Sequence, residues 1–194
     1  LNGALKAGWP ANMISVIDPN PSDALRKQAA EAGFALNPAP GSGTAQLVLL
    51  AIKPQMLDSA AATLASHVSG ETVLVSILAG KSIADLKARL PAVTKLVRAM
   101  PNTPAAIGRG ITGAYASGTL SEAEKALILL LLKTTGRLEW VDAESLIDAV
   151  TAVSGSGPAY VFYLVEALAR AGEEVGLPAD LAMRLARATI EGAG

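Results

Sequence analysis

Short apolar runs separated by segments of helical length constrain the fold of this chain more than any other feature. Two of them, Gln46–Ile52 and Thr72–Leu78, are near-continuous and typical of strands buried on both faces of a sheet. Met13–Ile17 and Thr94–Met100 are further strand candidates. Because helices of about ten residues fit between these runs, the pattern predicts βαβ units and a mostly parallel sheet.

Serine residues stand where three of the predicted helices begin. Ser22 can cap a helix that stops at Gly33, and Ser82 can cap another after the strand at 72–78. Ser121 and Glu124 have the spacing of a capping box, which predicts a helix over 122–135. Two further strands are expected at 111–116 and 137–141.

The strand pattern disappears after Leu146. Apolar residues then recur at helical spacing, and Gly176-Leu177-Pro178 separates a first helix from a second over 179–191. We therefore expect an α/β domain over residues 1–145 and the first helices of an all-helical domain over residues 146–194. Two helices this apolar need a partner subunit or further chain to cover them.

Both ends of the chain read as interrupted. A nucleotide-binding α/β domain begins with a strand, a Gly-x-Gly-x-x-Gly turn and a helix, whereas here the first element is the end of a helix closed by Gly8. We expect a longer native polypeptide at both ends. In such a domain the first strand lies in the middle of the sheet. Without it, the two strands on either side would each have an unpaired edge.

Composition excludes several classes of protein. The chain of 194 residues is 51% hydrophobic with a formal net charge of −1, so it has a large core and no basic surface for nucleic acid. It has no cysteine and one histidine, which argues against a zinc site or a Ser-His-Asp triad, and we expect no metal. The longest apolar run, Ala126–Leu132, is too short to span a membrane. Without a signal peptide pattern at the start, a cytoplasmic protein is expected.

Candidate ligand-binding residues follow the predicted strands, where open α/β sheets bind ligands. Asp18 ends the first strand and could hydrogen-bond a ribose, or simply form a turn with Pro19. Ala51-Ile52-Lys53-Pro54 follows the next strand, although a lone lysine in a loop is more often only solvated. Ile77, Leu78 and Ala79 end the third strand; the Ala79–Ser82 stretch is not a phosphate loop, because Val75 stands where the motif needs glycine.

Two later segments complete the set of candidates. Met100–Pro104 is stiffened by two prolines and presents the Asn102 amide and the Thr103 hydroxyl, but could equally be a structural turn. Ser154, Gly155, Ser156 and Gly157 form an apparent turn before a long apolar helix, a candidate floor for an anionic substrate at the helix N-terminus.

Other polar residues are interpreted as structural. His67 lies near a helix end, where histidine more often complements the helix C-terminus than performs acid–base chemistry. The pairs Glu122/Glu124 and Glu173/Glu174 are interpreted as solvent-exposed acids on helix faces, without a role.

Taken together, these segments resemble pyrroline-5-carboxylate reductase. The resemblance rests on three stretches in order, Ala51–Pro54, Val97–Pro104 and Ala152–Tyr160, and extends over essentially the whole chain. It implies a Rossmann-like dinucleotide-binding domain over 1–145, with its first strand and glycine turn missing. It also implies that residues 146–194 begin a helical dimerisation domain, which makes the protein a homodimer or a higher homo-oligomer.

The resemblance also implies a reaction, the reduction of 1-pyrroline-5-carboxylate to L-proline by hydride from NAD(P)H. On this basis, the segments Ala51–Pro54 and Ile77–Ala79 contact the cofactor, as does Asp18. Asn102, Thr103 and the Ser154–Gly157 segment border the imino-acid substrate. The catalytic groups proper would lie outside the chain, in a downstream Gly-Gly-Thr-type segment, and the 194 residues alone are expected to be inactive.

The cofactor and two alternatives stay open at this point. Members of the family usually take NADPH and carry small polar residues at the position of Asp18, so this aspartate favours NADH unless Asn20, Ser22 or Arg26 accommodate the phosphate. The alternatives are a reductase of a different imine or ketone, and a non-catalytic dinucleotide-binding or proline-sensing protein of the same fold.

Overall fold

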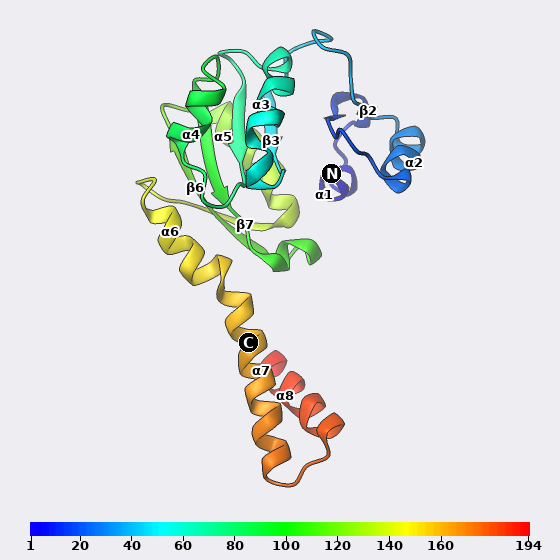
Figure 1. The fold of residues 1–194 in the computed structure, drawn as a ribbon, viewed down its shortest axis with the longest axis vertical. Helices are drawn as coiled ribbons and strands as arrows, with labels where there is room; N and C mark the ends of the chain where they lie inside the picture. The colour runs from blue at the N-terminus through cyan, green and yellow to red at the C-terminus, as the bar shows by residue number, and fades with distance from the viewer.

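The computed structural model describes all residues from 1 to 194. An α/β body carries a helical arm, made of α7 (Gly157–Glu174) and α8 (Ala179–Ala193), that projects away from it (Figure 1). The two helices of the arm pack mainly on each other. None of the helices combines the length and the apolar composition that crossing a bilayer requires.

The first 37 residues form an N-terminal unit that has its own two-stranded sheet and contacts the main body through α1 (Asn2–Lys6). It also contains β1 (Ser15–Val16), α2 (Asp23–Ala32) and β2 (Ala35–Leu36). The two strands pair in parallel, with Ser15 opposite Ala35. The expected helix start at Ser22 is confirmed, since its hydroxyl accepts from the Leu25 N–H, and α2 ends at Gly33 in the left-handed conformation.

The main sheet has five strands in the order β3-β4-β5-β6-β7. They are β3 (Leu47–Leu50), β4 (Val73–Ser76), β5 (Lys95–Met100), β6 (Gly110–Ser117) and β7 (Gly136–Trp140). All neighbours are parallel except β5 and β6. The predicted α/β class with a mostly parallel sheet is therefore confirmed.

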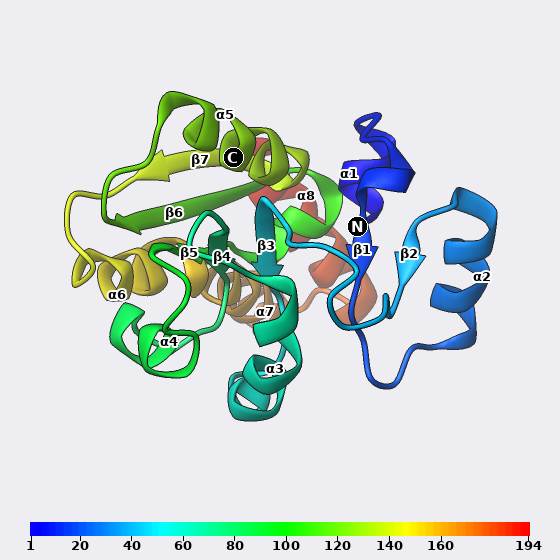
Figure 2. The same cartoon turned by 90° about the horizontal axis from the view of Figure 1, so that it is seen from above.

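Helices cover the two faces of this sheet separately (Figure 2). One face packs its leucines, such as Leu74 and Leu96, against α3 (Leu57–Leu64) and α4 (Ile83–Arg89). The other face packs Val75 and Val97 against Ile128 and Leu132 of α5 (Glu122–Leu132). The predicted capping box starts α5 at Ser121. The predicted N-cap at Ser82 starts α4, where the structure adds a capping box with Asp85.

The edge strand β3 differs from the prediction of a strand buried on both faces. Leu49 pairs in register with the fully buried Val75 but is 39% exposed, because β3 is an edge strand and α5 lies nearer β7, at the opposite edge (Figure 2). β1 and β3 belong to separate sheets, with no ladder between them. β1 and β3 therefore each have one edge without a neighbouring strand.

The Ser154–Gly157 segment is not the turn that the sequence predicts. α6 (Leu146–Val150) continues into a π-helical stretch, η6 (Thr151–Gly155), and a bend at Ser156 then leads into α7. Ser154 and Gly155 are part of the helix, and the i→i+5 bond from the Ser156 N–H to the Thr151 carbonyl, 2.8 Å, closes its last π-helical turn before the bend. Such π-helical stretches are frequent at functional sites.

Candidate active site

The ends of three parallel strands bring most of the candidate residues to one edge of the sheet. β3 leads into Ala51–Lys53, β4 into Ile77–Ala79, and β5 into Pro101–Thr103. Since β3, β4 and β5 run parallel in register, these segments lie side by side. This is the edge where open α/β sheets bind their ligands.

The two segments expected at the cofactor, Ala51–Pro54 and Ile77–Ala79, each present a small residue at the end of a strand. Ala51 and Ala79 are exposed small residues, which leave room for close approach of a ligand. Pro54 begins the short helix η2 (Pro54–Met56), and Lys53 is exposed without an ion pair. The Leu78 side chain belongs to the core beneath α3 and α4, so only its backbone faces the edge.

Asp18 lies just beyond β1 and is half-buried. Its Oδ1 accepts from the N–H of Asn20 at 2.9 Å, which closes a local turn. Its backbone N–H and carbonyl both bond to the side chain of Asn37, each at 2.8 Å. No lysine or arginine pairs with its carboxylate, so the group keeps its capacity to accept hydrogen bonds from a ligand.

The Asn102 side chain has a structural partner that sequence reasoning missed. Its Oδ1 accepts from the backbone N–H of Ile111 at 3.0 Å, which ties the loop after β5 to the start of β6. The Nδ2 group donates to no protein atom. Thr103 is exposed at the start of the short helix η4 (Thr103–Ile107). The Oδ1 atom of Asn102 is thus held by a backbone N–H, and the Nδ2 group can donate to a ligand.

The π-helical stretch meets the same edge through Met100. An added Cβ on Gly155 would lie 3.7 Å from the Met100 Cε, so the last residue of β5 packs against the helix at this glycine. The structure therefore brings Gly155 next to the strand that leads into the Asn102/Thr103 loop.

Within the π-helical stretch, the polar groups are largely occupied by the helix itself. The Ser154 hydroxyl donates to the Val150 carbonyl at 3.0 Å, and the Tyr160 N–H donates to the Ser156 carbonyl. A bend at Ser156 separates η6 from α7, which starts at Gly157. Pro158 has no N–H, and the Ala159 and Tyr160 N–H groups donate to the Ser156 carbonyl, so the first turn of α7 has at most the Gly157 N–H to offer an anion. The Ser154 hydroxyl oxygen is still able to accept a hydrogen bond.

An ion pair joins the strand edge to the segment before α6. Glu144 Oε1 accepts from Arg98 Nη1 of β5 at 2.9 Å and from the Ile83 N–H at the start of α4 at 2.7 Å. An arginine in the middle of an apolar strand signals a buried, paired charge, but a partner 46 residues away cannot be read from the sequence.

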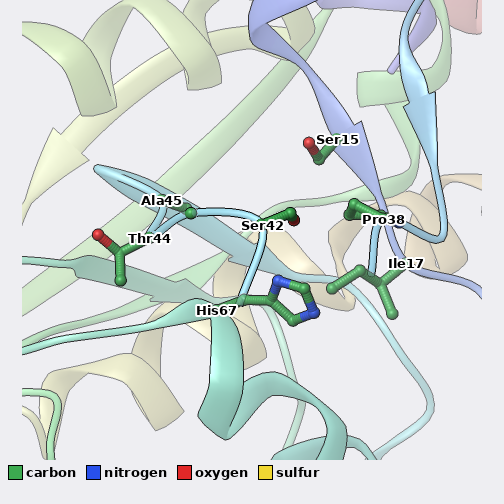
Figure 3. A pocket seen from close by; sticks show the side chains of 8 residues that line it. Ser15, Ile17, Pro38, Ser42, Thr44, Ala45 and His67 are labelled. Atoms are coloured by element: carbon green, nitrogen blue, oxygen red, sulfur yellow. The ribbon is translucent and has the colours of Figure 1, made fainter. Parts of the chain in front are cut away.

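His67 and Glu124 have structural surroundings away from this edge. His67 is buried at the end of η3 (Ala65–His67) and lines a cavity of about 180 Å³ with Ser15 and Ser42, its ring pointing toward Ile17 and Pro38 (Figure 3). The interpretation of Glu124 as solvent-exposed is wrong, since its side chain is only 19% exposed. The bonds that it accepts from Lys95 and Ser121 lower its pKa from 4.5 to about 2.

Comparison with protein families matches both parts of the chain. Residues 144–194 match the family described as pyrroline-5-carboxylate reductase dimerisation. Residues 1–80 match the family described as NADP oxidoreductase, coenzyme F420-dependent.

Known relatives and solved structures extend the likeness over the whole chain. The chain is 41% identical to pyrroline-5-carboxylate reductase of Pseudomonas aeruginosa, over 100% of the chain and 71% of that protein. It is 37% identical to the enzyme of the same name from Haemophilus influenzae, over 98% of the chain and 70% of that protein. The structure of a pyrroline-5-carboxylate reductase from Coxiella burnetii superposes with a TM-score of 0.87 at 31% identity, covering 99% of this chain and 72% of that one.

A structure of pyrroline carboxylate reductase from Plasmodium falciparum with NADP bound has the same fold, with a TM-score of 0.76 at 24% identity, covering 98% of this chain and 70% of that one. The identity of 37–41% over nearly the whole chain goes beyond a shared fold. This chain belongs to the pyrroline-5-carboxylate reductase family.

Proposed function

We propose that this chain carries the nucleotide-binding body and part of the substrate pocket of an enzyme that reduces 1-pyrroline-5-carboxylate to L-proline with NAD(P)H, the last step of proline biosynthesis. The observation that carries the proposal most directly is the packing of Met100 against Gly155. It joins the strand edge of a dinucleotide-binding fold to the helix that leads into the dimerisation region, in a chain of this family.

The residues present fit a dinucleotide along the strand edge. Ala51 and Ala79 leave space at the ends of β3 and β4, and the Asp18 carboxylate is an acceptor suited to ribose hydroxyls. We propose that Ala51–Pro54 and Ile77–Ala79 hold the cofactor, the latter through backbone atoms at Leu78. When bound, the nicotinamide supplies the hydride that is added to the C=N carbon of the imine.

The residues around the imine orient it rather than exchange protons with it. A cyclic imine is protonated readily in water, so no histidine base is required of this chain. We propose that Asn102 Nδ2 and Thr103 donate to the imino acid from one side, while Ser154–Gly157 closes the other side. This pocket positions the imine carbon in line with the cofactor.

We also propose the domain division 1–145 and 146–194, and assembly as a homodimer through the helical part. The apolar side chains left exposed on α7 support this assembly, as does the match of residues 144–194 to a family described as dimerisation. A cytoplasmic location stays a prediction, which cell fractionation would test.

A steady-state assay of the full-length protein tests the proposed function. With pyrroline-5-carboxylate and either NADH or NADPH, we expect loss of absorbance of the reduced cofactor and formation of L-proline in equal amounts. Turnover of another imine or ketone without proline formation would favour a different reductase. Cofactor binding without any turnover would favour a non-catalytic binding or sensing protein.

A further inference from the structure

The side chain of Asn37 continues the pairing of β1 with β2 beyond the last residues of the strands. The ladder runs from the Ala35 N–H to the Ile14 carbonyl at 3.0 Å and from the Asn37 N–H to the Val16 carbonyl at 2.8 Å. At the next step, the Asp18 N–H donates to Asn37 Oδ1 and Asn37 Nδ2 donates to the Asp18 carbonyl, both at 2.8 Å. The side-chain amide thus takes the place that a further peptide group of β2 would occupy.

The backbone of Asn37 explains why a side chain is needed here. Its φ is +51°, and it is the only residue other than glycine with positive φ. Asparagine tolerates this left-handed conformation better than most residues. The main chain therefore turns away from β1 into the loop at Pro38. The Asn37 side chain remains beside β1 and bonds to the backbone of Asp18.

As a result, Asp18 is held at three points. Two bonds from Asn37 hold its backbone, and the Asn20 N–H holds Oδ1 of its carboxylate at 2.9 Å. The carboxylate is fixed at the end of β1 with Oδ2 free of protein partners. A carboxylate in this place accepts from the hydroxyls of an adenosine ribose and repels a 2′-phosphate.

We infer that Asn37 is a positioning residue that fixes Asp18 for the adenosine ribose, and that the pair thereby selects NADH over NADPH. The inference rests on one part of the proposed function, the binding of a dinucleotide along this edge. It goes further by naming the preferred cofactor and the residue that sets the preference.

A competing cation lies close by in the sequence. Arg26 is exposed on α2 and has no ion pair, and Ser22 precedes it in the same helix as the N-cap. A guanidinium near the ribose could neutralise a 2′-phosphate. However, the Ser22 hydroxyl is already used, as acceptor from the Leu25 N–H at 3.2 Å, and the fixed Asp18 carboxylate opposes the phosphate.

Isothermal titration of the full-length protein with NADH and with NADPH, in the absence of any imino acid, tests the inference without turnover. We expect the wild type to bind NADH at least about tenfold more tightly than NADPH, because like charges oppose the phosphate. Asn37→Gly keeps the left-handed backbone accessible but removes the amide. It should raise the Kd for NADH about three- to tenfold, the effect of losing one or two hydrogen bonds, and change the Kd for NADPH less.

Two further variants separate positioning from general damage. Asp18→Asn keeps the oxygen that accepts from Asn20 but removes the charge, so NADPH should bind more tightly and the preference should fall. Asn12→Gly changes an exposed asparagine without side-chain hydrogen bonds, and the ratio of the two Kd values should stay as in the wild type. If Asn37→Gly does not fold, Asn37→Asp serves instead: it loses the Nδ2 donor, so NADH binding should again weaken.

The possible outcomes distinguish this inference from the proposed function. Binding of neither cofactor by the wild type would overturn the proposed function itself. Tighter binding of NADPH than NADH would overturn the cofactor selection and point to Arg26. An unchanged Kd ratio in Asn37→Gly would overturn the role of Asn37 while leaving the reductase proposal in place.

Discussion

Gly113 of β6 has no side chain, and this allows α6 to approach the sheet closely. A Cβ on this residue would lie 2.6 Å from the Val150 Cγ1 and 2.8 Å from its Cγ2. Valine is short and cannot move aside, so Gly113→Ala should overpack this contact. We expect a loss of about 1–3 kcal/mol in the free energy of unfolding, measured by urea denaturation.

A second substitution supplies the control for this contact. Val150→Ala removes the two methyl groups that clash, so adding it to Gly113→Ala should recover part of the loss. Gly157→Ala has no atom within 4 Å of the new Cβ and should not destabilise the protein. Equal stability of Gly113→Ala and the wild type would contradict the close packing of α6 on β6.

Asn102 combines a structural bond with the proposed contact to substrate, and two variants separate them. Asn102→Ala removes the acceptor for the Ile111 N–H, which should cost about 1 kcal/mol of stability and raise the KM for the imino acid. Asn102→Asp keeps the acceptor but loses the Nδ2 donor. It should therefore unfold near the wild-type urea midpoint while its KM rises about tenfold or more, since it also repels the substrate carboxylate. A wild-type KM for both variants would exclude Asn102 from the substrate pocket.

Among the elements, a charge cluster anchors α5 to the sheet. Lys95 at the start of β5 contacts Glu124 of α5 and Glu71 in the loop before β4, both at 2.8 Å. Hydrogen bonding, chiefly with Glu124, raises the pKa of Lys95, while Lys95 and then Ser121 lower the pKa of Glu124 to about 2. Because the folded pKa of Glu124 lies below its ordinary value of 4.5, its contribution to stability is complete above about pH 4.5 and is lost as the pH falls toward 2.

Thermal unfolding at several pH values tests this prediction. Glu124→Gln should have a lower Tm than the wild type at pH 6, and the difference should shrink between pH 4.5 and pH 2. Glu122→Gln is the matched control, since Glu122 lies in the same turn but its side chain is 90% exposed. A Tm difference for Glu124→Gln that does not depend on pH would contradict the ion pair.

At the scale of the whole molecule, the helical arm carries more apolar surface than its own packing covers. Leu164, Leu168 and Leu185 are all more than 40% exposed, and a groove of about 430 Å³ between α7 and α8 is lined by seven apolar residues among nine. Exposed apolar surface of this kind marks an interaction site. We expect the full-length protein to be a dimer or larger in solution, by light scattering coupled to size exclusion.

Charges on the arm should break this assembly. The double variant Leu164→Glu/Leu168→Glu should shift the protein toward monomer, while Met13→Glu, at an exposed residue of the N-terminal unit, should not. A monomeric wild type would contradict the proposed assembly. Unchanged assembly of the double variant would place the interface elsewhere.

The parts of the fold that depend on neighbouring residues could be predicted from the sequence. Ser22, Ser82 and Ser121 start their helices as expected, because a cap needs only a side-chain oxygen and an N–H three residues on. The exposure of Leu49 and the bond from Ile111 to Asn102 could not be predicted. They depend on where α5 lies on the sheet and on how β6 returns beside the loop.

The sequence by itself therefore determined the class of fold, the caps and the strand-end positions of the candidate residues. These features depend on residues that are close together in the chain. Only the tertiary structure decided that Ser154 and Gly155 extend α6 as a π-helix, that Met100 meets Gly155, and that Asn37 holds Asp18. These contacts join residues from separate elements, and their free energy depends on distances that arise only when the strands and helices have packed.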